Sequence, residues 1–382
     1  MSKERKFISV NEPLFNGNEK KYLCHCIDTG WISSEGEYVK QLEIGVADYV
    51  GRKYGIAVCN GSVALDLAVE SLQLQEGDEV IMPSFTIISC ASALVRRGIK
   101  PVLVDSDKDT WNMDVTQIQA KISSKTRAIM VVHIYGLPVD MDPVLALAIK
   151  YGLKIIEDAA EAHGLRYKGK MCGSFGDVSI MSFYPNKHIT TGEGGMVLTD
   201  SEEIATRCLS YRNLCFKPER RFMHEELGYN YRMSNIQAAV GVAQLEKINE
   251  HLEIKRKMGQ QYTELLSMQD GFKIAIPKTN YADNIYWVFG ILLKEECKLD
   301  AVDVIRKLGE YGIGCRPFFY PMHQQPVFKK MGLFNNEHYP VSERLAKKGF
   351  YIPSGLTLLA EDIQYISECV KEVVMEGIDE GK

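Results

Sequence analysis

The chain has 382 residues, of which 46% are hydrophobic and 25% charged, and its formal net charge is −5. That length allows a sizeable core without stapling by disulfides or metals, and the slight acidic excess argues against a nucleic-acid-binding protein. The longest apolar run, over residues 144–149, is too short to span a membrane. Ten scattered cysteines and a polar start over residues 1–6 favour a cytosolic protein without a secretory signal.

Short β-branched runs alternate with amphipathic stretches in the first half of the chain. The first run is followed by a helical pattern over residues 62–74, and the second run ends at Pro83. Strands separated by helices predict a mostly parallel sheet that is covered on both faces, and ligands bind such sheets beyond the carboxyl ends of the strands. The expected strands cover residues 55–59, 79–82, 100–104, 127–132, 153–157 and 196–199.

The second part of the chain has a different, mixed pattern. It begins with a long helical stretch over residues 234–268, broken once, and continues with shorter elements. These are a strand at 284–293, a helix at 302–311, a short strand at 313–316 and a closing helix at 361–375. We therefore predict an α/β protein with a large domain over residues 1–250 and a smaller α+β domain over residues 251–382.

Asn60, Gly61 and Ser62 come directly after the first expected strand and open a helix. Glycine lets the backbone come close to an anion, and the first N–H groups of a helix point toward it. These residues are therefore candidates for phosphate binding. A simple helix cap would explain Asn60 or Ser62 equally well.

Asp158 stands at the carboxyl end of a very apolar strand, with Glu161 three residues later. A carboxylate at this edge could hold a proton on a heterocyclic nitrogen, bind a metal, or only cap the next helix. No cluster of His and Asp with suitable spacing accompanies it, so we expect no metal site.

Lys187 lies between a short strand ending near Ser182 and the glycine-rich turn at residues 192–195. A desolvated lysine can lose its proton and form a Schiff base with an aldehyde. The glycines of the turn do not make a dinucleotide-binding fingerprint, because Val197 occupies the last glycine position of that motif.

Together these three elements match the needs of one cofactor, pyridoxal 5′-phosphate. A helix N-terminus would bind its phosphate, Asp158 would keep its ring nitrogen protonated, and Lys187 would bond its aldehyde. Phe85, just after Pro83, could stack on the face of the ring.

The chain resembles the DegT/DnrJ/EryC1/StrS family of sugar aminotransferases over essentially its whole length. The resemblance is carried by several long motifs in the same order, and not by one short pattern. The most specific are Asn60-Gly-Ser-Val-Ala-Leu65, Glu157-Asp-Ala-Ala-Glu-Ala162, Gly173-Ser-Phe-Gly-Asp177, the stretch from Ser182 through Lys187 to Gly195, Gly228-Tyr-Asn-Tyr-Arg-Met-Ser-Asn235, and Arg316-Pro-Phe-Phe-Tyr-Pro-Met-His323.

The resemblance implies a fold of the aspartate-aminotransferase type (fold type I) and a role for each matching residue. Lys187 would be the catalytic lysine. The cofactor would be bound by Gly61, Ser62, Phe85, Asp158, Glu161, Ser182 and Lys187, and by Asn230 acting on the phosphate in the neighbouring subunit of a homodimer. The pocket for the nucleotide sugar would be lined by Trp31, Arg316, Tyr320 and His323.

For several of these residues a structural role stays open. Trp31 and Tyr320 could be core aromatics, and Asn230 could cap or turn the chain within its own subunit. His188 is interpreted as a residue that only flanks Lys187, and His163 could serve packing or function.

The implied reaction moves an amino group from L-glutamate to the 4-keto carbon of a nucleotide-linked 4-keto-6-deoxy sugar. The expected substrate is GDP-4-keto-6-deoxymannose and the product GDP-perosamine, for O-antigen or other polysaccharide synthesis. Family members that remove a hydroxyl group instead carry His at the position of Lys187. The alternatives are a UDP- or dTDP-linked sugar as substrate, or a non-catalytic protein that binds nucleotide sugars on the same scaffold.

Overall fold

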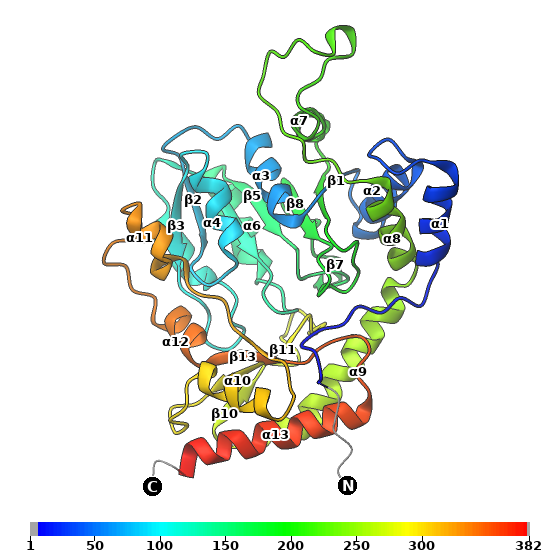
Figure 1. Ribbon diagram of the computed structural model, residues 1–382. Helices are drawn as coiled ribbons and strands as arrows, with labels where there is room; N and C mark the ends of the chain where they lie inside the picture. Colours follow the sequence, from blue (N-terminus) through cyan, green and yellow to red (C-terminus); the bar gives the residue numbers. More distant parts are fainter. Residues whose placement is uncertain (1–6, 380–382) are drawn as a thin grey trace.

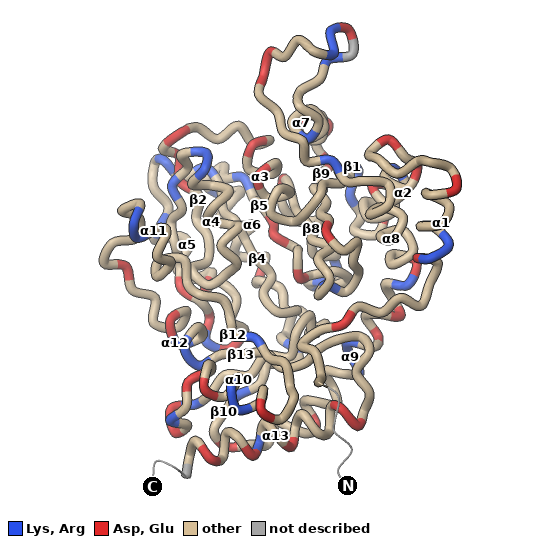
Figure 2. Tube along the Cα trace, in the orientation of Figure 1, with Lys and Arg blue, Asp and Glu red and all other residues tan. Residues whose placement is uncertain are grey.

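The computed structural model describes residues 7–379 and shows a larger and a smaller half joined by a long helix (Figure 1). Residues 1–6, on which the expectation about a secretory signal was based, lie outside this range. Within the described part of the chain, every helix lacks either the length or the apolar character needed to cross a membrane. Lys, Arg, Asp and Glu lie mainly on the outer helices and loops, while the strands of the large sheet carry few of them (Figure 2).

The larger half is built on a seven-stranded sheet in the order β1-β9-β8-β5-β4-β2-β3. Six strands run parallel, and only β9 runs antiparallel to both of its neighbours. This confirms the predicted mostly parallel sheet. The strands are β1 (Tyr54–Val58), β2 (Glu79–Pro83), β3 (Lys100–Val104), β4 (Thr126–Val132), β5 (Lys154–Asp158), β8 (Val178–Ser182) and β9 (Gly195–Thr199).

Both faces of this sheet are buried under helices. Successive side chains of a strand point to opposite faces, so neighbouring residues belong to different apolar clusters. Val58 of β1 belongs to one apolar cluster and its neighbour Ala57 to the other. The first cluster is covered by α3 (Gly61–Ser71), α4 (Ile88–Val95) and α7 (Glu202–Arg212). The second is covered by α1 (Glu19–Thr29), α2 (Glu37–Val50), α6 (Met141–Tyr151) and α8 (Asn235–Glu246).

The long helical pattern is two helices, as its expected break indicated. α8 ends at Glu246, and α9 (Ile248–Leu266) begins after Lys247 and runs into the smaller half. Ser234 caps α8, and the side chain of Gln237 in turn accepts a hydrogen bond from the backbone of Ser234. The break lies close to the predicted domain boundary at residue 250, which stays a prediction.

The smaller half contains a four-stranded antiparallel sheet with helices packed against it, as the mixed pattern predicted. Its apolar cluster joins the sheet to α9 and to the closing helix. The elements are β10 (Phe272–Ile274), β11 (Phe289–Leu293), β12 (Arg316–Pro317), β13 (Gly349–Ile352), α10 (Ala301–Glu310), α11 (Pro326–Lys330), α12 (Pro340–Lys348) and α13 (Ala360–Asp379).

Two details of the smaller half differ from the predicted elements. The strand expected over residues 284–293 begins only at Phe289, because Tyr286 adopts a left-handed φ of 50° and turns the chain. The segment expected as a strand at 313–316 contributes only its last residue to β12, and Ile313 instead pairs with Ile8 near the start of the chain. The first described residues therefore pack against the smaller half.

Candidate active site

The carboxyl ends of the parallel strands open into a cavity of about 680 Å³. Six of the residues that the sequence predicted for cofactor binding line it together: Gly61, Ser62, Asp158, Glu161, Ser182 and Lys187. They come from three separate segments of the chain, and the parallel order of the strands brings those segments to one edge of the sheet.

The first turn of α3 forms one end of the cavity. Asn60 caps this helix, because its side chain accepts a hydrogen bond from the N–H group of Val63 at 3.0 Å. Gly61 faces Ser182 so closely that a Cβ atom at position 61 would lie 2.8 Å from the Ser182 Cβ. Ser62 adds a hydroxyl group, 2.8 Å from that of Ser89. A helix N-terminus with hydroxyl groups and no side chain at position 61 fits a phosphate group.

Asp158 is the last residue of β5, and its carboxylate is buried. Its Oδ1 accepts a hydrogen bond from the N–H group of Ala160 at 3.0 Å, and its Oδ2 accepts one from the Cys90 thiol at 3.2 Å. Burial raises the pKa of Asp158 above its ordinary value, so its charged form needs a cationic partner. A protonated ring nitrogen of pyridoxal phosphate would be such a partner.

Lys187 lies in the loop between β8 and β9, with a side chain that is only 9% exposed. Its Nζ is 3.6 Å from Oε1 of Glu161 and 3.7 Å from the ring centroid of Trp287. Burial lowers the pKa of Lys187 and raises that of Glu161 to about 7. A lysine with a lowered pKa can act as a nucleophile and as a base, as the sequence predicted.

Two histidines, His163 and His188, lie buried near Lys187, and only His188 is its neighbour in the sequence. Both ring nitrogens of His163 and the Nδ1 of His188 have no hydrogen-bond partner among the described residues. Burial lowers the pKa of His163 to about 3 and that of His188 well below its ordinary value. His188 does not line the cavity, which agrees with its interpretation as a flanking residue.

The remaining predicted site residues do not line this cavity. Phe85 is buried, and its ring centroid lies 6.1 Å from that of Phe319, which does line it. His323 bonds Ser84 and Glu343 at the junction of the two halves. The other four have exposed side chains: Trp31, Asn230, Arg316 and Tyr320. The roles expected for these residues stay predictions.

Several residues that the structure brings to the site were not predicted from the sequence. Cys90 contacts Asp158, while Trp287, Phe319 and Tyr351 line the cavity. Phe319 belongs to a motif that carried the family resemblance, so it could have been found there. Trp287 precedes a buried strand without any motif, and only the placement of the smaller half over the sheet reveals it.

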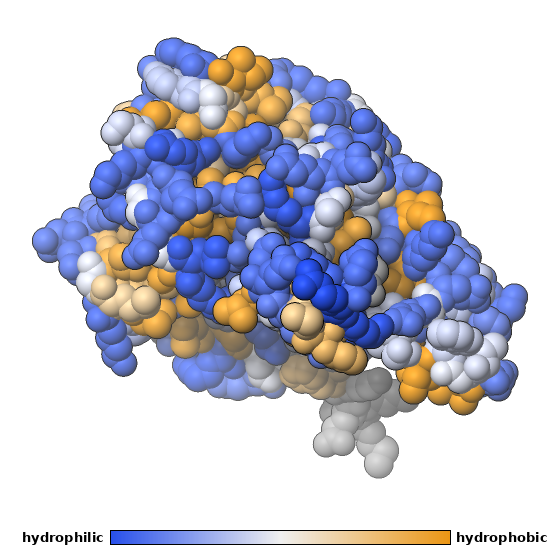
Figure 3. All heavy atoms as spheres, turned by 90° about the horizontal axis from the view of Figure 1, so that it is seen from above, coloured by the Kyte–Doolittle hydropathy of each residue, from blue (hydrophilic) through white to orange (hydrophobic). Residues whose placement is uncertain are grey.

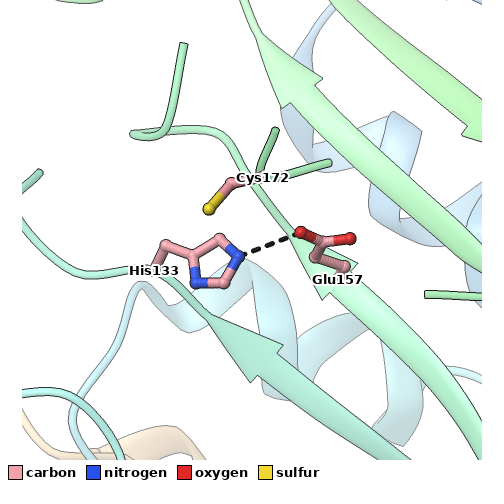
Figure 4. A group of neighbouring side chains, drawn as sticks. All are labelled: His133, Glu157 and Cys172. Carbon is pink, nitrogen blue, oxygen red and sulfur yellow. Dashed lines mark hydrogen bonds and ion pairs between the residues drawn. The ribbon is translucent and has the colours of Figure 1, made fainter. Parts of the chain in front are cut away.

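A second group of polar side chains lies beside the carboxyl ends of β4 and β5 (Figure 4). His133, Glu157 and Cys172 place their ligand atoms within 4.8 Å of one another and are all buried. Nδ1 of His133 accepts a hydrogen bond from the N–H group of Val139, so the ring proton is on Nε2. The Nε2–H group donates a hydrogen bond to Glu157 at 3.0 Å. These hydrogen bonds leave His133 no free lone pair for a metal ion.

The sequence of nearly the whole chain matches a known group of enzymes. The family model "DegT/DnrJ/EryC1/StrS aminotransferase family" matches residues 14–371. The chain belongs to this family. It is 39% identical over 368 residues to the GDP-perosamine synthase of Escherichia coli O157:H7, covering 96% of this chain and 98% of that protein.

Solved structures show the same fold. PseC of Helicobacter pylori, an aminotransferase of pseudaminic acid biosynthesis, superposes with a TM-score of 0.92 at 22% identity, covering 97% of this chain and all of that one. A GDP-4-keto-6-deoxymannose-3-dehydratase with bound GDP-perosamine superposes with a TM-score of 0.86 at 25% identity, covering 94% of this chain and all of that one. Family membership, together with this fold, makes the protein a pyridoxal-phosphate-dependent aminotransferase of fold type I, as predicted.

Proposed function

We propose that the enzyme transfers the amino group of L-glutamate to the 4-keto carbon of GDP-4-keto-6-deoxymannose and so makes GDP-perosamine. The observation that carries the proposal is the near full-length similarity to a GDP-perosamine synthase, combined with a buried lysine at the centre of the cavity. Synthesis of an O-antigen or another polysaccharide would use this product. A cytosolic location stays a prediction of the sequence.

Some residues of the cavity would bind the cofactor, and one would transfer protons. The first turn of α3, with Ser182, would hold the phosphate group, and Asp158 would hold the proton of the ring nitrogen. When bound, the cofactor carries the amino group and withdraws electrons from the carbon atom that loses its proton. Lys187 would take the proton from Cα of glutamate and return a proton at C4′ of the cofactor.

Lysine at position 187 also favours amino transfer over removal of a hydroxyl group. An amine can attack the aldehyde carbon of the cofactor and be displaced again by a substrate amine, whereas a histidine at this position could exchange protons only. His188 does not replace it, because its side chain is buried outside the cavity.

We further propose a homodimer in which each subunit completes the other's site. The segment between α7 and α8 projects from the larger half, at the top of Figure 1. Its tip exposes apolar side chains, with Phe222 81% and Leu227 92% exposed. Seen from above, apolar side chains interrupt the hydrophilic surface of this face (Figure 3). Asn230 lies at the base of the segment and is exposed, and in the proposed dimer its side chain would reach the partner's phosphate site.

Two measurements test the proposed reaction. L-Glutamate alone should be converted to about one equivalent of 2-oxoglutarate per site, and Lys187→Ala should produce none. A wild-type protein that forms no 2-oxoglutarate would be a binding protein and not an enzyme.

The aminated protein should then be offered GDP-, UDP- and dTDP-linked 4-keto-6-deoxy sugars, with ¹⁵N-labelled glutamate as the donor. We expect the label in the GDP sugar. Preferential labelling of a UDP or dTDP sugar would keep the chemistry and overturn the proposed substrate.

A further inference from the structure

Trp287 forms one wall around the catalytic lysine. The Lys187 Nζ lies 3.7 Å from the centroid of its ring, while Glu161 lies 3.6 Å from the same Nζ. Trp287 itself is only 2% exposed. Its indole N–H donates to the backbone oxygen of Asn186 at 2.8 Å, and its ring stacks on that of Tyr135 at 5.8 Å. The hydrogen bond fixes the edge of the Trp287 ring, and the stacking contact with Tyr135 fixes its face.

We propose that Trp287 is a positioning residue for Lys187: its ring face holds the lysine's ammonium group inside the site whenever that nitrogen is not bonded to the cofactor. The inference rests on the role of Lys187 in the proposed function. It assigns Trp287 a part in the proton transfer, although its side chain has no acid or base group.

The physical reason lies in what the two neighbours of the ammonium group can do. Burial keeps the Glu161 carboxyl partly protonated near neutral pH, so its negative charge is incomplete. A carboxylate can also take the proton that the lysine must deliver. An aromatic face attracts the cation through its quadrupole but accepts no proton. Trp287 thus stabilises the charged lysine and leaves the proton on Nζ.

Core packing is the alternative explanation of Trp287, and it predicts something different. A residue that only fills space would support the fold without affecting the protonation of Lys187. The other titratable groups around Lys187 keep their chemical identity when position 287 is substituted. They are Asp158, Glu161, His163, His188, Lys255 and, in the same cavity, Tyr351.

The deciding measurement is the pKa of Lys187 in the full-length protein without cofactor. Competitive labelling with acetic anhydride over a range of pH, read by peptide mass spectrometry, gives this value for single lysines. Trp287→Leu removes the ring face, and the pKa of Lys187 should fall by about 0.5 to 1.5 units. Trp287→Phe keeps a weaker face and should lower it less. The exposed Lys150 of the same samples, which lies over the ring of Tyr151 and not of Trp287, is the internal reference.

A fluorinated protein tests the same contact without the change of side-chain shape that Trp287→Leu introduces. The chain has three tryptophans, so growth on 5-fluorotryptophan changes few sites and weakens the ring quadrupole without changing its shape. The pKa of Lys187 should fall slightly in this protein. In Trp287→Phe, which keeps only Trp31 and Trp111, growth on 5-fluorotryptophan should leave the pKa of Lys187 unchanged.

Equal pKa values of Lys187 in wild type, Trp287→Phe and Trp287→Leu would overturn the proposal. So would equal shifts in the two variants, or a shift that Lys150 shares, because these indicate a general structural effect. None of these measurements uses a sugar substrate. An unexpected nucleotide sugar would therefore overturn the proposed function and leave the role of Trp287 standing.

Discussion

Two buried carboxylates, Glu157 and Asp158, lie next to each other at the carboxyl end of β5, and they have different roles. Glu157 faces His133 and Cys172, and its carboxylate also accepts hydrogen bonds from the N–H groups of Gly173, Phe175 and Gly176. Its neighbour Asp158 points to the other face of the sheet, because side chains alternate along a strand. There it lines the cavity that contains Lys187.

The two groups differ in how many hydrogen-bond donors their carboxylates have. Burial alone would raise the pKa of Glu157, but hydrogen bonds from His133 and from the backbone hold it below its ordinary value. Burial raises the pKa values of Asp158 and Glu161, which have fewer donors. A closed network stabilises the fold, whereas an open one leaves room for a ligand. The following experiments perturb one group and use the other as its control.

The largest effect is expected at Lys187. Lys187→Ala removes the nucleophile and the base, so turnover should fall on the order of 10⁴-fold or more. The visible absorbance of the lysine-bound cofactor should disappear as well. Steady-state kinetics and absorbance spectra measure this, with the exposed Lys150→Ala as the control. A variant with wild-type turnover would end the assignment.

Asp158→Asn should lower turnover roughly 10²- to 10³-fold. The amide cannot hold a proton on the ring nitrogen, so the cofactor withdraws electrons less well. The free energy of unfolding of the apoprotein should change little, because no ion pair of Asp158 is lost. Urea unfolding and the glutamate half-reaction test this. A large loss of stability with normal chemistry would place Asp158 in the structural group instead.

Glu157→Gln should show the reverse pattern. The substitution puts an amide donor among groups that already donate, and it should lower the free energy of unfolding by about 2–4 kcal/mol. Turnover per folded molecule should stay close to wild type. Urea unfolding monitored by circular dichroism gives the stability, and active-site titration gives the folded fraction. Unchanged stability with lost turnover would contradict a structural role.

The pH dependence of stability should separate Glu161 from Glu157. The folded-state pKa of Glu161 is raised by burial to about 7, so its stabilising effect is present below pH 4.5 and is lost as the pH rises through 7. Its size is at most about 3 kcal/mol. Glu161→Gln should flatten this part of the profile in the apoprotein. The depressed pKa of Glu157 has the opposite sign, and its stabilisation is lost as the pH falls below about 4.5.

Urea unfolding of the apoprotein between pH 4 and pH 8 measures both effects. Glu157→Gln is the matched control for Glu161→Gln, because each replaces a buried carboxylate by an amide. The buried His163 and His188, whose pKa values are lowered, contribute the same slope to both proteins, so the difference between wild type and Glu161→Gln isolates Glu161. A difference that does not shrink as the pH rises through 7 would contradict the expected sign for Glu161.

The smallest expected signal tests whether the open site is shared between subunits. Equal amounts of Lys187→Ala and Asn230→Ala, each strongly impaired alone, should recover about a quarter of wild-type activity after subunit exchange. Half of the dimers would be mixed, and each would contain one intact site of two. Mixing Lys187→Ala with Asp158→Asn is the control, since both residues lie in one subunit's cavity. No recovery despite confirmed exchange would show that Asn230 acts within its own chain.

The sequence by itself predicted the large sheet and the cofactor end of the site. Alternating strands and helices fix a parallel order, and such an order brings Gly61, Asp158, Ser182 and Lys187 to one edge whatever the details of packing. Local signals also gave the break between α8 and α9. These features depend on short stretches of chain, which carry their own periodicity and caps.

Only the tertiary structure decided which of the other residues reach the cavity. Trp287 and Tyr351 enter it because the smaller half lies over the edge of the large sheet, and Arg316 and Tyr320 do not line it. The same holds for the two neighbours on β5: the sequence showed both carboxylates, but not that the backbone after Cys172 would close around Glu157 alone. Contacts between segments far apart in the chain follow from how whole layers pack, and no local pattern of residues records that packing.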